Sequence, residues 1–237
     1  MRIVLASIAG SVGKTTIAAH MFCPRMPKAR VFAVETTNMT VSHFGIPAEE
    51  LSSEEFKDLY KKLSRIDDAI VDVGGSKEAK QFLAAMDWLE GHDEVDAFVV
   101  PAMPEDKDQK AAYQTIELLM AQGVSKDKIK VIFNAVQKNT VAEFDYLLGA
   151  LTVNNIPFAI EATIFRNDLY DLLSQQKRSL ASVLSDTTDY KAIMRKMEAE
   201  TDADETEIER LANLMIAQKG APKVNANLDT VYSALFR

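Results

Sequence analysis

Residues 3–16 read Ile-Val-Leu-Ala-Ser-Ile-Ala-Gly-Ser-Val-Gly-Lys-Thr-Thr, and the residues that follow, 17–21, are suited to a helix. A strand, a glycine-containing loop and a helix in this order form a site for phosphate. The loop N–H groups and the helix N-terminus attract an anion. Lys14 then reaches the outer phosphates, and Thr15 places a hydroxyl where it can ligate magnesium. The alternative interpretation is an ordinary turn between a strand and a helix.

The rest of the chain alternates short apolar runs with segments of helical periodicity, which is typical of a parallel sheet built from strand–helix–strand units. The apolar runs hardly alternate with polar residues, which indicates helices on both faces of the sheet. The predicted strands are residues 2–7, 30–35, 68–73, 95–101, 129–134 and 157–160. The predicted helices are residues 14–22, 47–64, 76–90, 106–122, 140–153 and 167–174. The sequence therefore predicts an α/β fold with a mostly parallel central sheet and extra C-terminal helices.

Strand signals end near residue 175, so we divide the chain into three parts. Residues 1–175 are the predicted nucleotide-binding core. Residues 176–219 are interpreted as helices that pack on the core or are offered to a partner. Residues 220–237 contain Pro222 and are interpreted as a linker with an amphipathic tail. A stripe at helical spacing predicts helix packing by Met194, Met197, Leu211, Leu214 and Met215.

Composition limits the partners and the compartment. The 27 basic and 35 acidic residues give a net charge of -8, so the chain has no broad field that attracts DNA or anionic lipid. Cys23 is the only cysteine, which excludes an intrachain disulfide and a zinc site of several cysteines. No apolar run is long enough to span a membrane. We expect a cytoplasmic protein, in which His20, His43 and His92 are packing or surface residues.

The glycine loop resembles that of the deviant phosphate-loop ATPases, which include the ParA partition proteins and MinD. Their loop typically reads K-G-G-x-G-K-[ST]-T, and residues 10–16 are similar to it from the second position onward. Ala9 stands where the family has a lysine that reaches across a dimer to the partner's phosphates. Ser11 replaces the second glycine, and Ile8 stands at the first glycine of the general motif. Within the family, the chain resembles the plasmid-stability StbB group most.

Two carboxylates stand at the C-terminal ends of predicted strands, at positions where the resemblance implies magnesium binding. Glu35 stands at the first acid of the family's D-x-D element, while Thr37 replaces the second acid, which positions the attacking water. Asp72 ends a strand and leads into Gly74 and Gly75, as in the family's D-x-x-G element. An Asp that caps the next helix is the alternative reading. The implied metal ligands are Thr15, Glu35 and Asp72.

Later segments are expected to surround the base. Asn134 ends a predicted strand where the family has an asparagine that hydrogen-bonds adenine, although a strand-end turn also explains it. Phe165 and Arg166 lie where related proteins wrap a loop around the base and ribose. The resemblance implies nucleotide contacts by Gly10, Ser11, Val12, Gly13, Lys14, Thr15, Thr16, Asn134, Phe165 and Arg166. Lys14 and Asp72 are the implied catalytic residues.

The resemblance implies a molecular switch that uses ATP/ADP and Mg²⁺, with weak ATPase activity, in plasmid stability, segregation or conjugative transfer. The implied partners are a second copy in a nucleotide-dependent homodimer and a DNA-binding adaptor protein, with little or no direct contact to DNA. Ala9 and Thr37 favour an alternative, a nucleotide-locked scaffold that hardly hydrolyses ATP. A dethiobiotin-synthetase-like enzyme is a third reading, but it needs a further substrate pocket that the sequence does not indicate.

Overall fold

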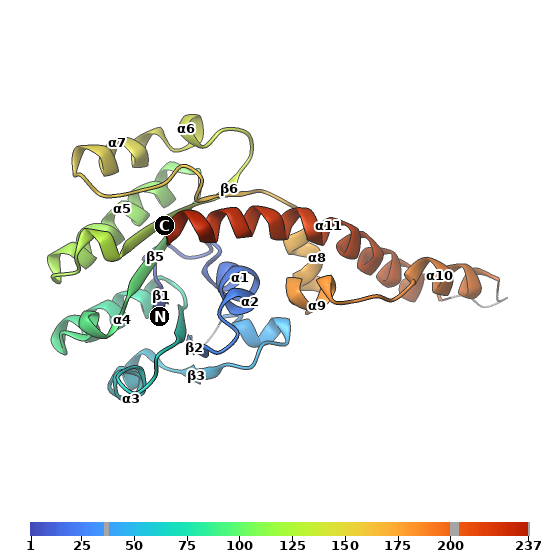
Figure 1. Cartoon of the computed structure of the whole chain (residues 1–237), viewed down its shortest axis with the longest axis horizontal. Helices are drawn as coiled ribbons and strands as arrows, with labels where there is room; N and C mark the ends of the chain where they lie inside the picture. Colours follow the sequence, from blue (N-terminus) through green and yellow to red (C-terminus); the bar gives the residue numbers. More distant parts are fainter. Residues whose placement is uncertain (36–37, 200–203, 237) are drawn as a thin grey trace.

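A computed structural model describes residues 1–35, 38–199 and 204–236. Its centre is a seven-stranded sheet in the order β3-β2-β4-β1-β5-β6-β7, in which every neighbouring pair is parallel (Figure 1). The strands are β1 Arg2–Leu5, β2 Arg30–Val34, β3 Glu49–Leu51, β4 Ala69–Val73, β5 Ala97–Ala102, β6 Ile129–Val136 and β7 Thr163–Phe165. This confirms the predicted fold class.

Helices cover both faces of the sheet (Figure 1). In chain order they are α1 Lys14–Ile17, the π-helix η1 Ala18–Phe22, α2 Cys23–Arg25, the 3-10 turns η2 Val41–Phe44 and η3 Ser53–Glu55, α3 Phe56–Leu63, α4 Ser76–Trp88, the 3-10 turn η4 Gly91–Glu94, α5 Asp106–Ala121, the 3-10 turn η5 Lys126–Lys128, α6 Thr140–Glu143, α7 Asp145–Val153, α8 Leu169–Gln175, α9 Leu180–Leu184, α10 Tyr190–Glu198 and α11 Glu205–Leu235. None of these described helices has the length and apolar character needed to cross a bilayer.

The core has two halves because side chains of a strand alternate between faces. In β1, Val4 faces the cluster built with α3, α4, α5 and α7. Ile3 and Leu5 face the other cluster, built with α1, η1, α8, α9 and α11. Both halves are fully buried, which explains why the strands read as continuous apolar runs.

Two predicted elements are wrong. Residues 157–160 form no strand, because Pro157 has no N–H to donate and Phe158 and Ile160 are partly exposed; β7 lies further along the chain. The predicted helix 47–64 begins later, because β3 extends the sheet edge beside β2. A capping box at Ser52 then starts the helical segment.

The C-terminal region also differs from the prediction. Helix α11 continues through Gly220 and Pro222 to Leu235, so residues 220–237 do not form a linker. The reason is packing, since a buried face anchors this half of the helix to the core while Pro222 lies on the exposed side. That face consists of Ala217, Ala221, Val224, Leu228, Val231 and Leu235.

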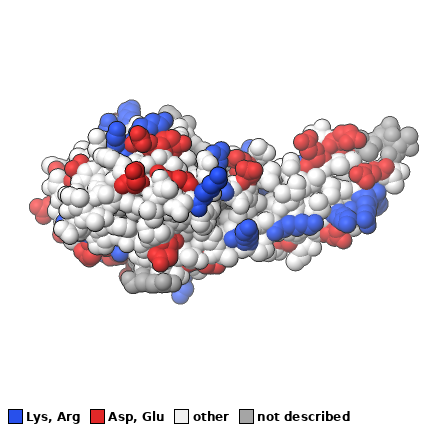
Figure 2. Space-filling model, turned by 90° about the horizontal axis from the view of Figure 1, so that it is seen from above, with Lys and Arg blue, Asp and Glu red and all other residues white. Residues whose placement is uncertain are grey.

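The first half of α11 and α10 project from the sheet as an arm (Figure 1). The arm has a small core of its own, in which Tyr190, Leu211 and Leu214 are buried. The methionines at 194, 197 and 215 pack against it, which confirms the predicted helix packing. Seen from above, the arm carries both basic and acidic side chains rather than one sign of charge (Figure 2).

Candidate functional site

The glycine loop lies at the middle of the sheet's carboxyl edge, because β1 pairs with β4 on one side and β5 on the other. This is the edge at which ligands bind to open α/β sheets. Two loop residues, Ser11 with φ +59° and Gly13 with φ +87°, adopt the left-handed conformation. A Cβ at Gly13 would lie 2.5 Å from Asn134 Nδ2, so this position also lacks room for a side chain.

Lys14 begins α1 and is 5% exposed. Its ammonium folds back onto the loop, where Nζ donates to the carbonyls of Ser7 (3.4 Å) and Ala9 (3.1 Å). Burial lowers the pKa of Lys14, and the nearby carboxylates of Asp72, Glu35 and Glu78 oppose that shift. The lysine therefore lies in a buried, acid-lined compartment.

Asp72 is brought to this compartment by the sheet register, which pairs it with Leu5 at the end of β1. It is 2% exposed, and the Thr15 side chain is hydrogen-bonded to it. Burial raises the pKa of Asp72 to about 6, against the effects of Thr15 and Lys14. Its Oδ1 has no hydrogen-bond partner within the described part of the chain.

Glu35 joins the loops that follow β2 and β4. Its Oε2 accepts hydrogen bonds from Asn38 Nδ2 (2.7 Å) and from the Gly75 N–H (3.0 Å). A Cβ at Gly74 would lie 2.0 Å from the same oxygen, so the close approach requires glycine. Thr37, the residue at the family's second acid position, lies outside the described residues.

The donor set fits magnesium better than a metal held by protein side chains alone. Among the described residues, no group of three or more His, Cys, Asp and Glu is placed to hold a metal ion. Magnesium, however, commonly takes one or two protein oxygens and completes its shell with water and phosphate. The adjacent Thr15 hydroxyl and Asp72 carboxylate, with its unpartnered Oδ1, match that requirement.

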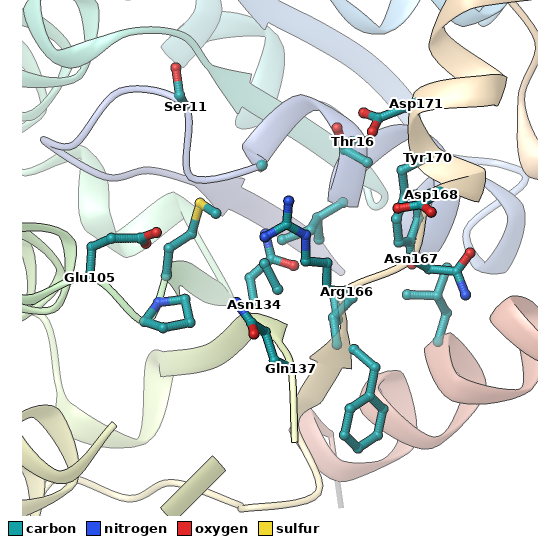
Figure 3. A pocket seen from close by; sticks show the side chains of 18 residues that line it. Ser11, Thr16, Glu105, Asn134, Gln137, Arg166, Asn167, Asp168, Tyr170 and Asp171 are labelled. Carbon is teal, nitrogen blue, oxygen red and sulfur yellow. The ribbon is translucent and has the colours of Figure 1, made fainter. Parts of the chain in front are cut away.

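A cavity of about 420 Å³ opens beside the loop (Figure 3). Ser11, Gly13 and Thr16 form one wall, and the chain segments after β5, β6 and β7 form the others, with α8 and α11 closing it. The Arg166 side chain lies between Asn134 and the start of α8 (Figure 3). Cavities of this size accept small organic ligands.

The structure places the predicted base-pocket residues at this cavity. Asn134 lines it and donates from Nδ2 to the Val12 carbonyl (2.9 Å), so its amide is held against the loop. Arg166 and Phe165 also line it, and Phe165 is 49% exposed.

Several lining residues were missed by sequence reasoning. They follow strands β5, β6 and β7 within a few residues, which is the signal that identifies them in retrospect. Those residues are Glu105, Gln137, Asn167, Asp168, Tyr170 and Asp171.

The predicted site residues thus fall into two adjoining compartments. Lys14, Glu35 and Asp72 belong to the acid-lined compartment, whereas Asn134 and Arg166 belong to the cavity. Gly13 and Thr16 of the loop border the cavity, directly beside Lys14 and Thr15 in the chain. A ligand with an organic portion and a chain of anionic groups suits this arrangement.

No protein-family model matches the sequence, and no curated protein matches it. Solved structures do match. Apo McdA from Cyanothece has 14% identity and a TM-score of 0.61, with 99% of this chain and 98% of that chain covered. MinD from Aquifex aeolicus has 16% identity and a TM-score of 0.55, with 90% and 95% covered. MinD from Pyrococcus horikoshii, complexed with Mg-ADP, has 13% identity and a TM-score of 0.51, with 94% and 98% covered. The chain therefore has the ParA/MinD-like phosphate-loop fold.

Proposed function

We propose that this chain is a molecular switch that binds ATP and magnesium. The observation that carries the proposal is the convergence of Lys14, Thr15 and Asp72 at the carboxyl edge of the sheet, beside a cavity of nucleoside size. The likeness to a Mg-ADP complex of a protein with the same fold supports it.

Each residue of the acid-lined compartment has a role in this proposal. Lys14 neutralises charge on the outer phosphates, while Thr15 and Asp72 hold the magnesium, with Glu35 near its water shell. Magnesium, when bound, neutralises charge on the phosphate oxygens. The loop N–H groups of residues 10–16 cradle the phosphates.

The cavity supplies the nucleoside contacts. Asn134 offers an amide that suits adenine, whose edge presents both a donor and an acceptor. Arg166 and Phe165 lie on the same side of the cavity, at the end of β7. We propose that they flank the base and ribose.

The hydrogen bonds of Lys14 and Glu35 suggest how a bound nucleotide would change the loops after β2 and β4. Lys14 must leave the carbonyls of Ser7 and Ala9 to meet a phosphate. A phosphate that meets the Gly75 N–H must displace Glu35, which now accepts from it. Since Glu35 joins the loops after β2 and β4, this exchange couples the nucleotide to both loops.

The biological task we propose is plasmid stability, segregation or conjugative transfer. The net charge of -8 and the mixed charge of the face in Figure 2 favour an adaptor protein as the component that contacts DNA. A second copy of the chain, bound in the presence of nucleotide, is the other proposed partner. The arm of α10 and α11 projects from the core and is available for such a contact.

Nucleotide titration tests the proposal. Wild-type protein should bind ATP and ADP with magnesium in a calorimeter, and Lys14→Ala should weaken binding at least about 100-fold, because a charge-assisted contact in a buried site is lost. Lys80→Ala, an exposed lysine of α4, is the matched control and should bind normally. Failure of the wild type to bind either nucleotide refutes the proposal.

Ala9 favours a second candidate, a nucleotide-locked scaffold. It is 8% exposed and contributes only backbone groups to the loop, whereas the family has a lysine there. Steady-state phosphate release separates the two candidates. The switch predicts that wild type releases phosphate faster than Lys14→Ala, and the scaffold predicts equal rates although only wild type binds nucleotide.

A further inference from the structure

Glu78 is a largely buried carboxylate. The sequence patterns gave it no functional role. It lies in the first turn of α4 and is 8% exposed. Within the described part of the chain, its carboxylate makes no hydrogen bond and no ion pair. Its oxygens are not among the fully buried side-chain atoms of the described residues that lack a hydrogen-bond partner, so the carboxylate keeps access to water.

The surroundings of Glu78 point to the phosphate compartment. A Cβ at Gly75 would lie 3.2 Å from Glu78 Oε2, 3.4 Å from Asn38 Nδ2 and 4.0 Å from Glu35 Oε2. Three side chains, from α4 and from the loop after β2, therefore converge over one backbone position. The carboxylate of Glu78 is also close enough to Lys14 to act on its charge.

The other two carboxylates of this compartment already have bonds. Glu35 accepts hydrogen bonds from Asn38 and Gly75, and Asp72 is hydrogen-bonded by Thr15 at the proposed magnesium site. Among the described carboxylates that act on the charge of Lys14, Glu78 is the third. Thr36 and Thr37, which follow Glu35 in the chain, have hydroxyl side chains and offer no carboxylate.

We propose that Glu78 orients and deprotonates the water that hydrolyses the bound nucleoside triphosphate; this inference rests on the proposed function. The water oxygen forms a bond to the γ-phosphorus, and the bond from that phosphorus to the β–γ bridging oxygen breaks. The electron pair of the broken bond leaves with the diphosphate. The water proton passes to the Glu78 carboxylate and then to the released phosphate, so the side chain is regenerated.

Glu78→Gln tests this role, because it keeps the size of the side chain and removes its basicity. We expect kcat for phosphate release to fall at least about 100-fold, as is typical for loss of a general base. The affinity for ATP and for ADP, measured by calorimetry, should stay within about threefold of wild type. The purified variant should also retain intact ATP after incubation with magnesium, as measured by chromatography of the released nucleotide. Asp87→Asn, an exposed acid of the same helix, is the matched control and should behave as wild type.

Chemical rescue separates a catalytic role from a structural one. Glu78→Ala should lose activity in the same way, and added formate, a small carboxylate, should restore part of it. Should Glu78→Gln fail to fold, Glu78→Asp provides the comparison, with reduced kcat and unchanged binding.

Three results overturn the inference while leaving the proposed function intact. These are unchanged phosphate release in Glu78→Gln, absence of rescue by formate, and nucleotide binding by a wild type that releases no phosphate. Absence of nucleotide binding in the wild type would instead remove the proposed function itself.

Discussion

Asp72→Asn should stabilise the nucleotide-free protein at neutral pH, although Asp72 is a proposed magnesium ligand. Burial raises the pKa of this carboxyl from 3.8 to about 6. Each pKa unit corresponds to about 1.4 kcal/mol, so the ionised form costs the folded state on the order of 3 kcal/mol. Asparagine has the same shape and no charge. The pKa of about 6 already includes the attraction between Asp72 and Lys14, so we expect a gain of up to about 3 kcal/mol.

The pH dependence follows from the direction of the shift. The folded state holds the Asp72 proton more tightly than the unfolded state does, so this group lowers the stability as pH rises from about 4 to about 6. The variant lacks that titration. The difference in unfolding free energy between variant and wild type should therefore be small at pH 4 and reach its full value above pH 6.

Urea denaturation in EDTA, without nucleotide, measures this difference at several pH values. Addition of ATP and magnesium should stabilise the wild type and should stabilise the variant much less, because the ligand has lost a metal-binding carboxylate. The reasoning is refuted if the variant is less stable than wild type at pH 7.5. A stability difference that is the same at pH 4.5 and pH 7.5 refutes it equally.

Three further substitutions have expected effects on stability. Asp186→Asn should destabilise the protein by about 1–3 kcal/mol, because Asp186 accepts charged and neutral hydrogen bonds, including one from the Tyr190 hydroxyl (2.6 Å). These bonds lower the pKa of Asp186, so the loss is present above about pH 4 and disappears as pH falls through the folded-state pKa. Gly74→Ala should destabilise by about 1–3 kcal/mol, measured by urea unfolding, because the new Cβ displaces the Glu35 carboxylate. Pro222→Ala should stabilise by about 1–3 kcal/mol, measured by thermal unfolding, because Pro222 lies inside a helix on its exposed side.

Each of these substitutions has a control or a result that contradicts it. Asp171→Asn, an exposed acid, should leave stability near the wild-type value. An Asp186→Asn effect that persists unchanged into strong acid contradicts the assigned hydrogen bonds. A fully stable Gly74→Ala protein means that Glu35 does not need its position over Gly74. A destabilised Pro222→Ala protein means that helix α11 is not continuous.

The sequence predicts the central strands well because their position depends on local composition. Strands β1, β2 and β6 begin at the predicted residue, since fully buried strands appear as uninterrupted apolar runs. The two edge strands were missed or misplaced. An edge strand such as Glu49–Leu51 is short and polar, and its pairing is decided by the neighbouring strand rather than by its own residues.

The site residues likewise divide into those that local sequence predicts and those that depend on how elements pack. Lys14 and Thr15 follow β1, and Asp72 lies near the end of β4. The pairing of these two parallel strands brings the three residues together, as the motif spacing predicts. Glu78 and Tyr170 lie on helices, where the residue that faces the site depends on how the helix packs. No local pattern records that rotation for Glu78, whereas the place of Tyr170 a few residues after β7 is a signal that could have identified it.

Ser11 and Ala9 depart from the usual loop motif, and they alter the chemistry of the glycine loop more than its shape. Ser11 adopts the left-handed conformation that glycine accepts most easily, at a cost on the order of 1 kcal/mol. Ala9 keeps the backbone groups of its position, and its carbonyl accepts a hydrogen bond from Lys14. What is absent at this position is a cation able to reach a second copy. Under the proposed function, hydrolysis therefore depends on groups within one chain, and Glu78, which acts on the charge of Lys14, is the group proposed for this role.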